Sequence, residues 1–228
     1  EGLAQKTIDK VMRAADELGY RPNLLVQGIR TGKSKTVGVM IPPQDSYWSG
    51  IIYGIHDELT ANDYAPVFMW SGHRDDGYDE VGELDRVHSL IDRRVDGVIL
   101  WPYYANMYAG HLAEFSSRDL PVVSLDYRIQ NSELITDSIC ADDSLGARLV
   151  TEHLLEVDAE TFVHFCGSQN EAWSRDRRLG CEEVLKKRGV EKAIIREVPF
   201  DACPEDVIRE VLTDLGKSIA VFAATDHV

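Results

Sequence analysis

The chain has 228 residues, of which 44% are hydrophobic and 28% charged, and its formal net charge is −15. These values predict a soluble globular protein with one or two hydrophobic cores, and they exclude indiscriminate nucleic-acid binding by the bulk of the chain. No apolar run approaches the roughly 18 residues that a membrane-spanning helix needs, and no signal peptide opens the sequence.

The charge is unevenly distributed along the chain. Residues 1–36 hold seven Lys or Arg and four Asp or Glu, a net charge of +3, which leaves −18 for residues 37–228. A basic arm on an acidic body indicates that the arm is the part that meets a polyanion. The alternative is an ordinary linker with solvated charges.

Residues 5–18 are predicted to form a helix, because five apolar side chains share one face: Ile8, Val11, Met12, Ala15 and Leu18. Gly19 suits a left-handed C-terminal cap, and Pro22 prevents continuation. Residues 24–29 allow little more than one and a half further turns, and Gly28 costs about 1 kcal/mol relative to Ala inside a helix.

From residue 36 onward, apolar strands alternate with amphipathic helices. Strands are predicted at 36–41, 65–70, 97–101, 122–126, 138–141, 161–166, 193–198 and 219–223, and helices at 49–60, 78–93, 105–117, 144–155, 174–188 and 205–215. Near-continuous apolar strands separated by helices predict parallel sheets covered on both faces. The pattern is α/β, with two doubly wound units and a crossover near residues 140–144. The acidic residues 74–80 are interpreted as a loop that feeds a helix N-terminus.

Three segments in succession carry a family resemblance: residues 17–23 (ELGYRPN), 29–34 (IRTGKS) and 37–42 (VGVMIP). They resemble the junction between the helix-turn-helix headpiece and the effector-binding core of bacterial LacI/GalR repressors. The resemblance implies a periplasmic-binding-protein-like fold. It divides the chain into the last headpiece helix (1–22), a hinge segment (23–35), an N-terminal lobe (36–142) and an incomplete C-terminal lobe (143–228).

In that family, two hinge segments fold against each other on operator DNA, and each pushes one apolar side chain into the minor groove. The matching position is Ile29, and Val26 would meet the partner segment. The DNA-binding residues that the resemblance implies are Asn23, Val26, Ile29, Arg30 and Lys33. We expect the segment to be disordered until DNA and a partner order it. The alternative is that its apolar side chains pack on the core.

Ligands of open α/β sheets collect beyond the carboxyl ends of the strands. The side chains expected there are Asp45, Tyr47, Trp48, Trp101, Asp126, Trp173, Arg177, Phe200 and Asp226. Aromatic rings stack on the C–H faces of a sugar, and guanidinium and carboxylate groups bind its hydroxyls. The set therefore favours a hydroxyl-rich ligand. For Trp48 and Trp101 packing within a lobe is an equal alternative, and Asp126 could instead cap a turn.

The family resemblance assigns roles to some of these residues. Arg177 begins the family's R-x-x-G motif, whose Arg holds the effector. Asp226 ends a strand as in the family's S/A-N-D, although Thr225 replaces the Asn. Asp126 matches an effector-side Asp, and Trp48 an aromatic of the N-P-F-F loop, which reads D-S-Y-W here. Residues 142–143 (DD) stand at the crossover, as hinge caps or as ligand contacts.

No nucleotide-binding, nucleophile–base or metal-ligand pattern appears, and the four cysteines form no CxxC pair. These absences count against an enzyme. The family resemblance implies a cytoplasmic, non-enzymatic repressor without a cofactor, which binds operator DNA as a homodimer or a tetramer. Its effector, a sugar bound between the lobes, would act as inducer or corepressor. The alternative is a periplasmic solute-binding protein of an ABC transporter.

Overall fold

The computed structural model describes residues 4–21, 23–42, 46–71, 73–74, 77–78, 80–102, 109–126, 132–157, 159–169, 171–198, 204–213, 215 and 218–225. The chain forms two compact units, a first unit of Glu1–Ile139 and a second unit of Cys140–Val228. The division falls three residues before the boundary that the sequence predicted. None of the helices in these ranges is both long enough and apolar enough to cross a membrane.

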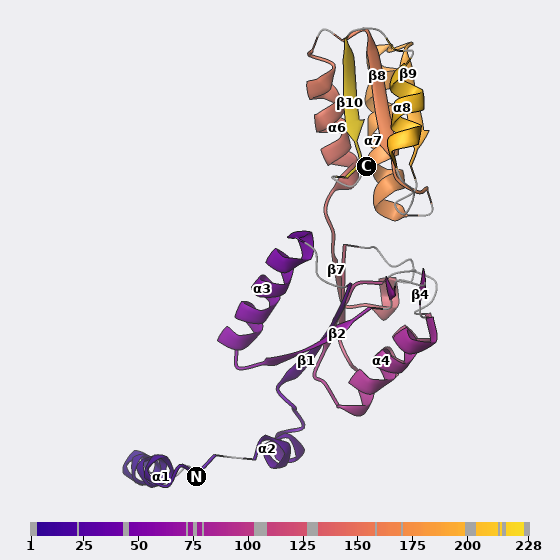
Figure 1. Ribbon diagram of the computed structural model, residues 1–228. Helices are drawn as coiled ribbons and strands as arrows, with labels where there is room; N and C mark the ends of the chain where they lie inside the picture. The colour runs from indigo at the N-terminus through magenta and orange to yellow at the C-terminus, as the bar shows by residue number, and fades with distance from the viewer. Residues whose placement is uncertain are drawn as a thin grey trace. The chain divides into compact units, whose positions relative to one another are not determined.

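The first unit begins with two helices, α1 (Gln5–Glu17) and α2 (Leu24–Thr31), followed by an α/β body (Figure 1). The elements of the body are β1 (Thr36–Ile41), α3 (Ser46–Ala61), β2 (Ala65–Trp70), β3 (His73–Arg74), β4 (Gly77–Tyr78), α4 (Glu80–Asp92), β5 (Val98–Leu100), α5 (Ala109–Ser117), β6 (Val122–Leu125), the 3-10 helix η1 (Ser132–Leu134) and β7 (Asp137–Ile139). Five strands form a parallel sheet in the order β2-β1-β5-β6-β7.

Helices cover both faces of this sheet, with α3 on one side and α4 on the other (Figure 1). Alternate residues of β1 supply the two cores: Met40 packs with Leu90 and Phe115 under α4 and α5, whereas Val39 packs with Ile52 under α3. A Cβ atom on Gly38 would lie 2.7 Å from the Leu90 side chain, so glycine leaves room for that side chain against β1. The predicted doubly wound unit is confirmed.

The second unit contains α6 (Asp143–Leu154), β8 (Thr161–Cys166), α7 (Ala172–Arg188), β9 (Ala193–Glu197), α8 (Pro204–Thr213) and β10 (Ile219–Ala223). Its parallel strands follow the order β10-β8-β9. Phe162 faces α6 and α7 in one core, and Val163 faces α8 in another. This sheet is therefore also covered on both faces, as the sequence predicted.

Three details differ from the sequence-based predictions. Residues 73–78 include a small antiparallel ladder, β3–β4, where only a loop was expected. The strand predicted at 138–141 is β7, which begins and ends earlier. The hinge segment forms the helix α2, which runs two residues beyond the predicted end. That this segment is disordered before it binds DNA stays a prediction. The Thr31 hydroxyl donates to the Gln27 carbonyl (2.9 Å), which satisfies one of the terminal acceptors of α2.

The first helix ends as predicted, with Gly19 in the left-handed region (φ 61°). Its start is weakly capped, because Ala4 offers no side-chain acceptor. The apolar face is exposed: within the described residues of α1 none is buried, and Val11 and Met12 are largely open to solvent.

Candidate functional site

In the first unit, four of the predicted side chains come together at the carboxyl ends of β1, β5 and β6. The Trp48 ring contacts Tyr47 (centroids 5.4 Å apart) and Trp101 (5.8 Å), in both cases edge to face. The Tyr47 hydroxyl donates to Asp126 Oδ1 at 3.3 Å. The strand ends therefore bring aromatic faces and a carboxylate into one cluster, as the sequence predicted.

Burial separates the roles of these aromatic residues. Trp48 is only 6% exposed and packs with Val39 and Ile52, so its ring belongs to the core. Tyr47 is 56% exposed, and the Asp126 side chain is partly buried. Of the two alternatives for Trp48, its burial favours packing. Tyr47 and Asp126 are the members of the cluster that are better placed to meet a ligand.

Asp126 has a backbone conformation that few residues adopt. Its φ is 57°, in the left-handed region, and its backbone N–H donates to the Ile139 carbonyl at 2.8 Å. A non-glycine residue at positive φ costs about 1 kcal/mol or more, and such strain concentrates at functional positions. The hydrogen bond across to β7 holds Asp126 in this conformation directly after β6.

In the second unit, Arg177 lies at the centre of the candidate site. Its Nε donates to Asp143 Oδ1 at 2.7 Å, Nη2 lies 2.7 Å from the same oxygen, and Nη1 donates to the Ala224 carbonyl. The guanidinium carbon lies 5.1 Å from the centroid of the Trp173 ring, a cation–π distance. Arg177 thus joins three elements, α6, α7 and the end of β10.

The glycine of the R-x-x-G motif has a packing role. A Cβ atom on Gly180 would lie closer than 3.0 Å to the Ser144 carbonyl oxygen, so its absence lets α7 approach the start of α6. This approach brings Arg177 to Asp143. Asp142 caps α6 by accepting the Leu145 N–H at 2.8 Å. The two acidic residues at the crossover therefore differ: Asp142 is a helix cap, and Asp143 is the partner of Arg177.

Trp173 also depends on a glycine. A Cβ atom on Gly167, just after β8, would lie 2.6 Å from the Trp173 ring. The ring is half-buried there, under the Arg177 guanidinium. Asp45, Phe200 and Asp226, the other predicted ligand residues, lie outside the described residues.

The predicted DNA-contacting residues lie on α2 and beside it. Ile29 is 86% exposed and Val26 62%, and Asn23, Arg30 and Lys33 are also exposed. Packing of Val26 and Ile29 on the core, which the sequence left open, is not what the structure shows. A Cβ atom on Gly28 would lie 3.2 Å from the Lys33 carbonyl oxygen, so Gly28 lets the chain after α2 fold back against it.

Buried titratable groups in the second unit have shifted pKa values. Burial lowers the pKa of His164, whose ring stacks on Phe222, and it raises the pKa of Cys166. Burial raises the pKa of Cys181 to about 11. Both thiols are therefore protonated at neutral pH and are poor nucleophiles. Among the described residues, no group of three or more His, Cys, Asp or Glu is arranged to hold a metal ion.

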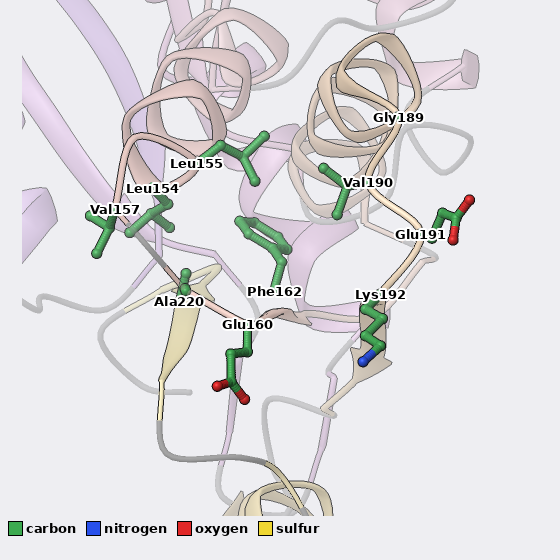
Figure 2. A pocket seen from close by; sticks show the side chains of 11 residues that line it. Leu154, Leu155, Val157, Glu160, Phe162, Gly189, Val190, Glu191, Lys192 and Ala220 are labelled. Carbon is green, nitrogen blue, oxygen red and sulfur yellow. The ribbon is translucent and has the colours of Figure 1, made fainter.

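A pocket of about 410 Å³ lies at the opposite end of the second unit's sheet (Figure 2). Leu154, Leu155 and Phe162 form part of its apolar wall, and the charged side chains of Glu191 and Lys192 point away from them. Phe162 is near the amino end of β8, whereas ligands of such sheets bind at carboxyl ends. This pocket is therefore separate from the Arg177 cluster.

Comparison with known proteins gives the family. The family described as "periplasmic binding proteins and sugar binding domain of LacI family" matches this chain over residues 34–201. The chain belongs to this family. It is 27% identical over 192 residues to catabolite control protein A of Staphylococcus xylosus, covering 84% of this chain and 56% of that protein. It is 25% identical over 231 residues to the ribose operon repressor of Halalkalibacterium halodurans, covering 99% and 65%.

Solved structures agree on the fold of this LacI-family chain. A solute-binding protein of an ABC transporter from Clostridium phytofermentans, with bound β-D-glucose, matches with a TM-score of 0.71 at 16% identity, covering 84% of this chain and 65% of that one. A transcriptional regulator CelR–cellobiose complex matches with a TM-score of 0.68 at 22% identity, covering 100% and 67%. The predicted periplasmic-binding-protein-like fold is confirmed. The chain spans 56–66% of the length of the first three curated relatives that it matches.

Proposed function

We propose that the full-length protein is a DNA-binding transcriptional repressor of the LacI/GalR type, which works in the cytoplasm as a homodimer and is controlled by a sugar. It has no enzymatic role in this proposal. The supporting relatives are themselves named as a repressor and a control protein.

One observation carries the proposal. The alignment with the ribose operon repressor covers 99% of the chain, so it includes the basic segment with α1 and α2, which precedes the family match at residues 34–201. In that segment α2 exposes Val26 and Ile29 beside the cations Arg30 and Lys33. Exposed apolar side chains flanked by positive charge fit insertion into a DNA minor groove between phosphates.

The sugar is proposed from the chemistry of the two clusters. In the first unit, Tyr47 and Asp126 offer an aromatic face and a carboxylate. In the second, Trp173 and Arg177 offer an indole ring and a guanidinium. Rings of this kind stack on sugar C–H faces, and the charged groups bind hydroxyls.

A solute-binding protein of a sugar transporter is the second candidate, because such a protein gives a fold match with a TM-score of 0.71. That match covers 84% of the chain, whereas the match to the regulator CelR covers all of it. The two candidates differ in one property, since only the repressor binds DNA.

The decisive experiment is selection of binding sites from random duplex DNA by the full-length protein. We expect a single two-fold symmetric sequence to be enriched. The Ile29→Ala variant should bind it at least tenfold more weakly, because the side chain proposed to enter the minor groove is lost. Its sugar affinity should be unchanged. Leu179→Ala, which removes an exposed apolar side chain from α7, is the matched control and should bind as the wild type does. Enrichment of no sequence would contradict the proposal.

The sugar is found by thermal-shift measurements with a panel that includes D-ribose, D-glucose and cellobiose. Arg177→Lys is the better test variant, because Arg177→Ala would leave Asp143, 11% exposed, without its cation. We expect Arg177→Lys to abolish the shift, and Arg188→Ala, in the last turn of α7, to retain it. By linkage, the sugar must change operator affinity by the same factor by which operator changes sugar affinity, with a sign that separates inducer from corepressor.

A further inference from the structure

The turn between α2 and β1 is held by one carboxylate, that of Asp96. Both of its oxygens accept hydrogen bonds: Oδ1 from the Ser34 backbone N–H (2.8 Å) and hydroxyl (3.0 Å), and Oδ2 from the Lys35 backbone N–H (2.9 Å). Asp96 is more than sixty residues away in sequence, two residues before β5. The end of the hinge segment is thus bonded to the amino end of a central strand.

Further contacts fix the same turn to both neighbours of β1. The Asp96 backbone N–H donates to the Thr36 carbonyl (2.8 Å), and on the other side the Ala65 N–H donates to the Lys35 carbonyl (2.9 Å). The Lys35 ammonium lies 4.3 Å from the centroid of the Tyr64 ring. Lys35 itself has a φ of 56°, a left-handed conformation that these contacts hold in place.

A carboxylate is suited to this position for a specific reason. Three donors converge on it, and an ionised Asp has only acceptors, so all three are satisfied by charge-assisted hydrogen bonds. Asn has the same shape but only one acceptor oxygen, and its amide N–H₂ would face a backbone N–H. A linker that only joined two domains would not need its exit direction fixed so closely.

We propose that Asp96 is a positioning residue, which sets the direction in which the hinge segment leaves the sheet and so fixes how α2 is presented to DNA. This inference rests on the proposed repressor function. Any displacement of the amino end of β5 is passed to Ser34 and Lys35 through the carboxylate. Asp96 itself does not touch DNA or sugar in this scheme.

The test uses the full-length protein with Asp96→Asn, and Asp92→Asn as control, since Asp92 is an exposed carboxylate at the end of α4. In Asp96→Asn the backbone amides of Ser34 and Lys35 should exchange hydrogen about tenfold faster, as expected for loss of a hydrogen bond to a charged group. The amides of β1, for which Gly38 is a reference, should be unchanged.

The functional readout is selectivity for half-site spacing, which a purely structural role would not change. Wild type should prefer its selected operator over one with a base pair inserted at the centre by at least tenfold, because fixed hinges demand a fixed spacing. Asp96→Asn should reduce this preference to about threefold or less, without a lower unfolding temperature.

The outcomes separate the two levels of inference. If Asp96→Asn keeps the spacing preference of the wild type, with or without faster amide exchange, Asp96 has no positioning role and the repressor function stands. A lower unfolding temperature with unchanged spacing preference also overturns the inference. If the wild type itself enriches no DNA, the repressor function fails, and the role of Asp96 fails with it.

Discussion

Gly180→Ala should destabilise the second unit, although alanine is the better helix former. The new Cβ would lie closer than 3.0 Å to the Ser144 carbonyl oxygen, 3.1 Å from its carbon and 3.2 Å from the Ala147 side chain. Two of these three atoms are backbone, so relief requires α6 and α7 to move apart. Overpacking of this kind costs about 3 kcal/mol, and the propensity gain offsets about 1 kcal/mol.

The net loss of about 2 kcal/mol should lower the unfolding temperature of a unit of this size by about 10 °C. Differential scanning calorimetry, which follows the unfolding transition of the second unit, measures it. The matched control is Gly146→Ala in the interior of α6, where an added Cβ would meet nothing within 4 Å. That variant should gain up to about 1 kcal/mol. If Gly180→Ala were as stable as the wild type or more stable, the close approach of α6 and α7 would be refuted.

Three other predictions concern single residues. Burial lowers the pKa of His164, so protonation of this residue favours the unfolded state. The contribution of neutral His164 to the stability of the second unit should be fully present above about pH 7. It should decrease as the pH falls below 6.5, the ordinary pKa of histidine. Urea titrations between pH 5 and 8 measure this, and His164→Gln should flatten the profile. Asp142→Ala removes the cap of α6 and should cost about 1 kcal/mol in the same titration, whereas an unchanged midpoint would contradict the cap. Gly28→Ala places a Cβ 3.2 Å from the Lys33 carbonyl oxygen and should weaken operator binding in a mobility-shift assay; equal or tighter binding would show that helix propensity governs this position.

The sequence predicted the strands well where both faces of a sheet are covered. β1, β2, β8 and β10 have the predicted bounds, because near-continuous apolar runs can be buried only in such a setting. The β3–β4 ladder was missed since its residues are polar and only two per strand. Local composition carries no signal for so short a pairing.

The sequence singled out residues that the structure brings together in the two clusters, but it did not predict their contacts. Strand ends and family motifs singled out Arg177, but its pairing with Asp143 depends on how closely α7 approaches α6. The sequence did not single out Asp96, because the three groups that donate hydrogen bonds to its carboxylate lie more than sixty residues earlier in the chain. Burial of Trp48 likewise depends on long-range packing, which spacing alone does not fix.

The protonated, buried thiol of Cys181 can report how often the second unit opens, because a reagent reaches it only in the open state. Cys181 follows Gly180 directly in α7 and is fully buried, whereas Cys140 is partly accessible. A maleimide reagent should therefore modify Cys140 at once, and Cys181 only when α6 and α7 separate. Because Cys166 is also a buried free thiol, the modification of Cys181 must be followed on its own peptide by mass spectrometry. The rate of that modification reports how often the helix pair that holds Arg177 opens, with no mutation introduced.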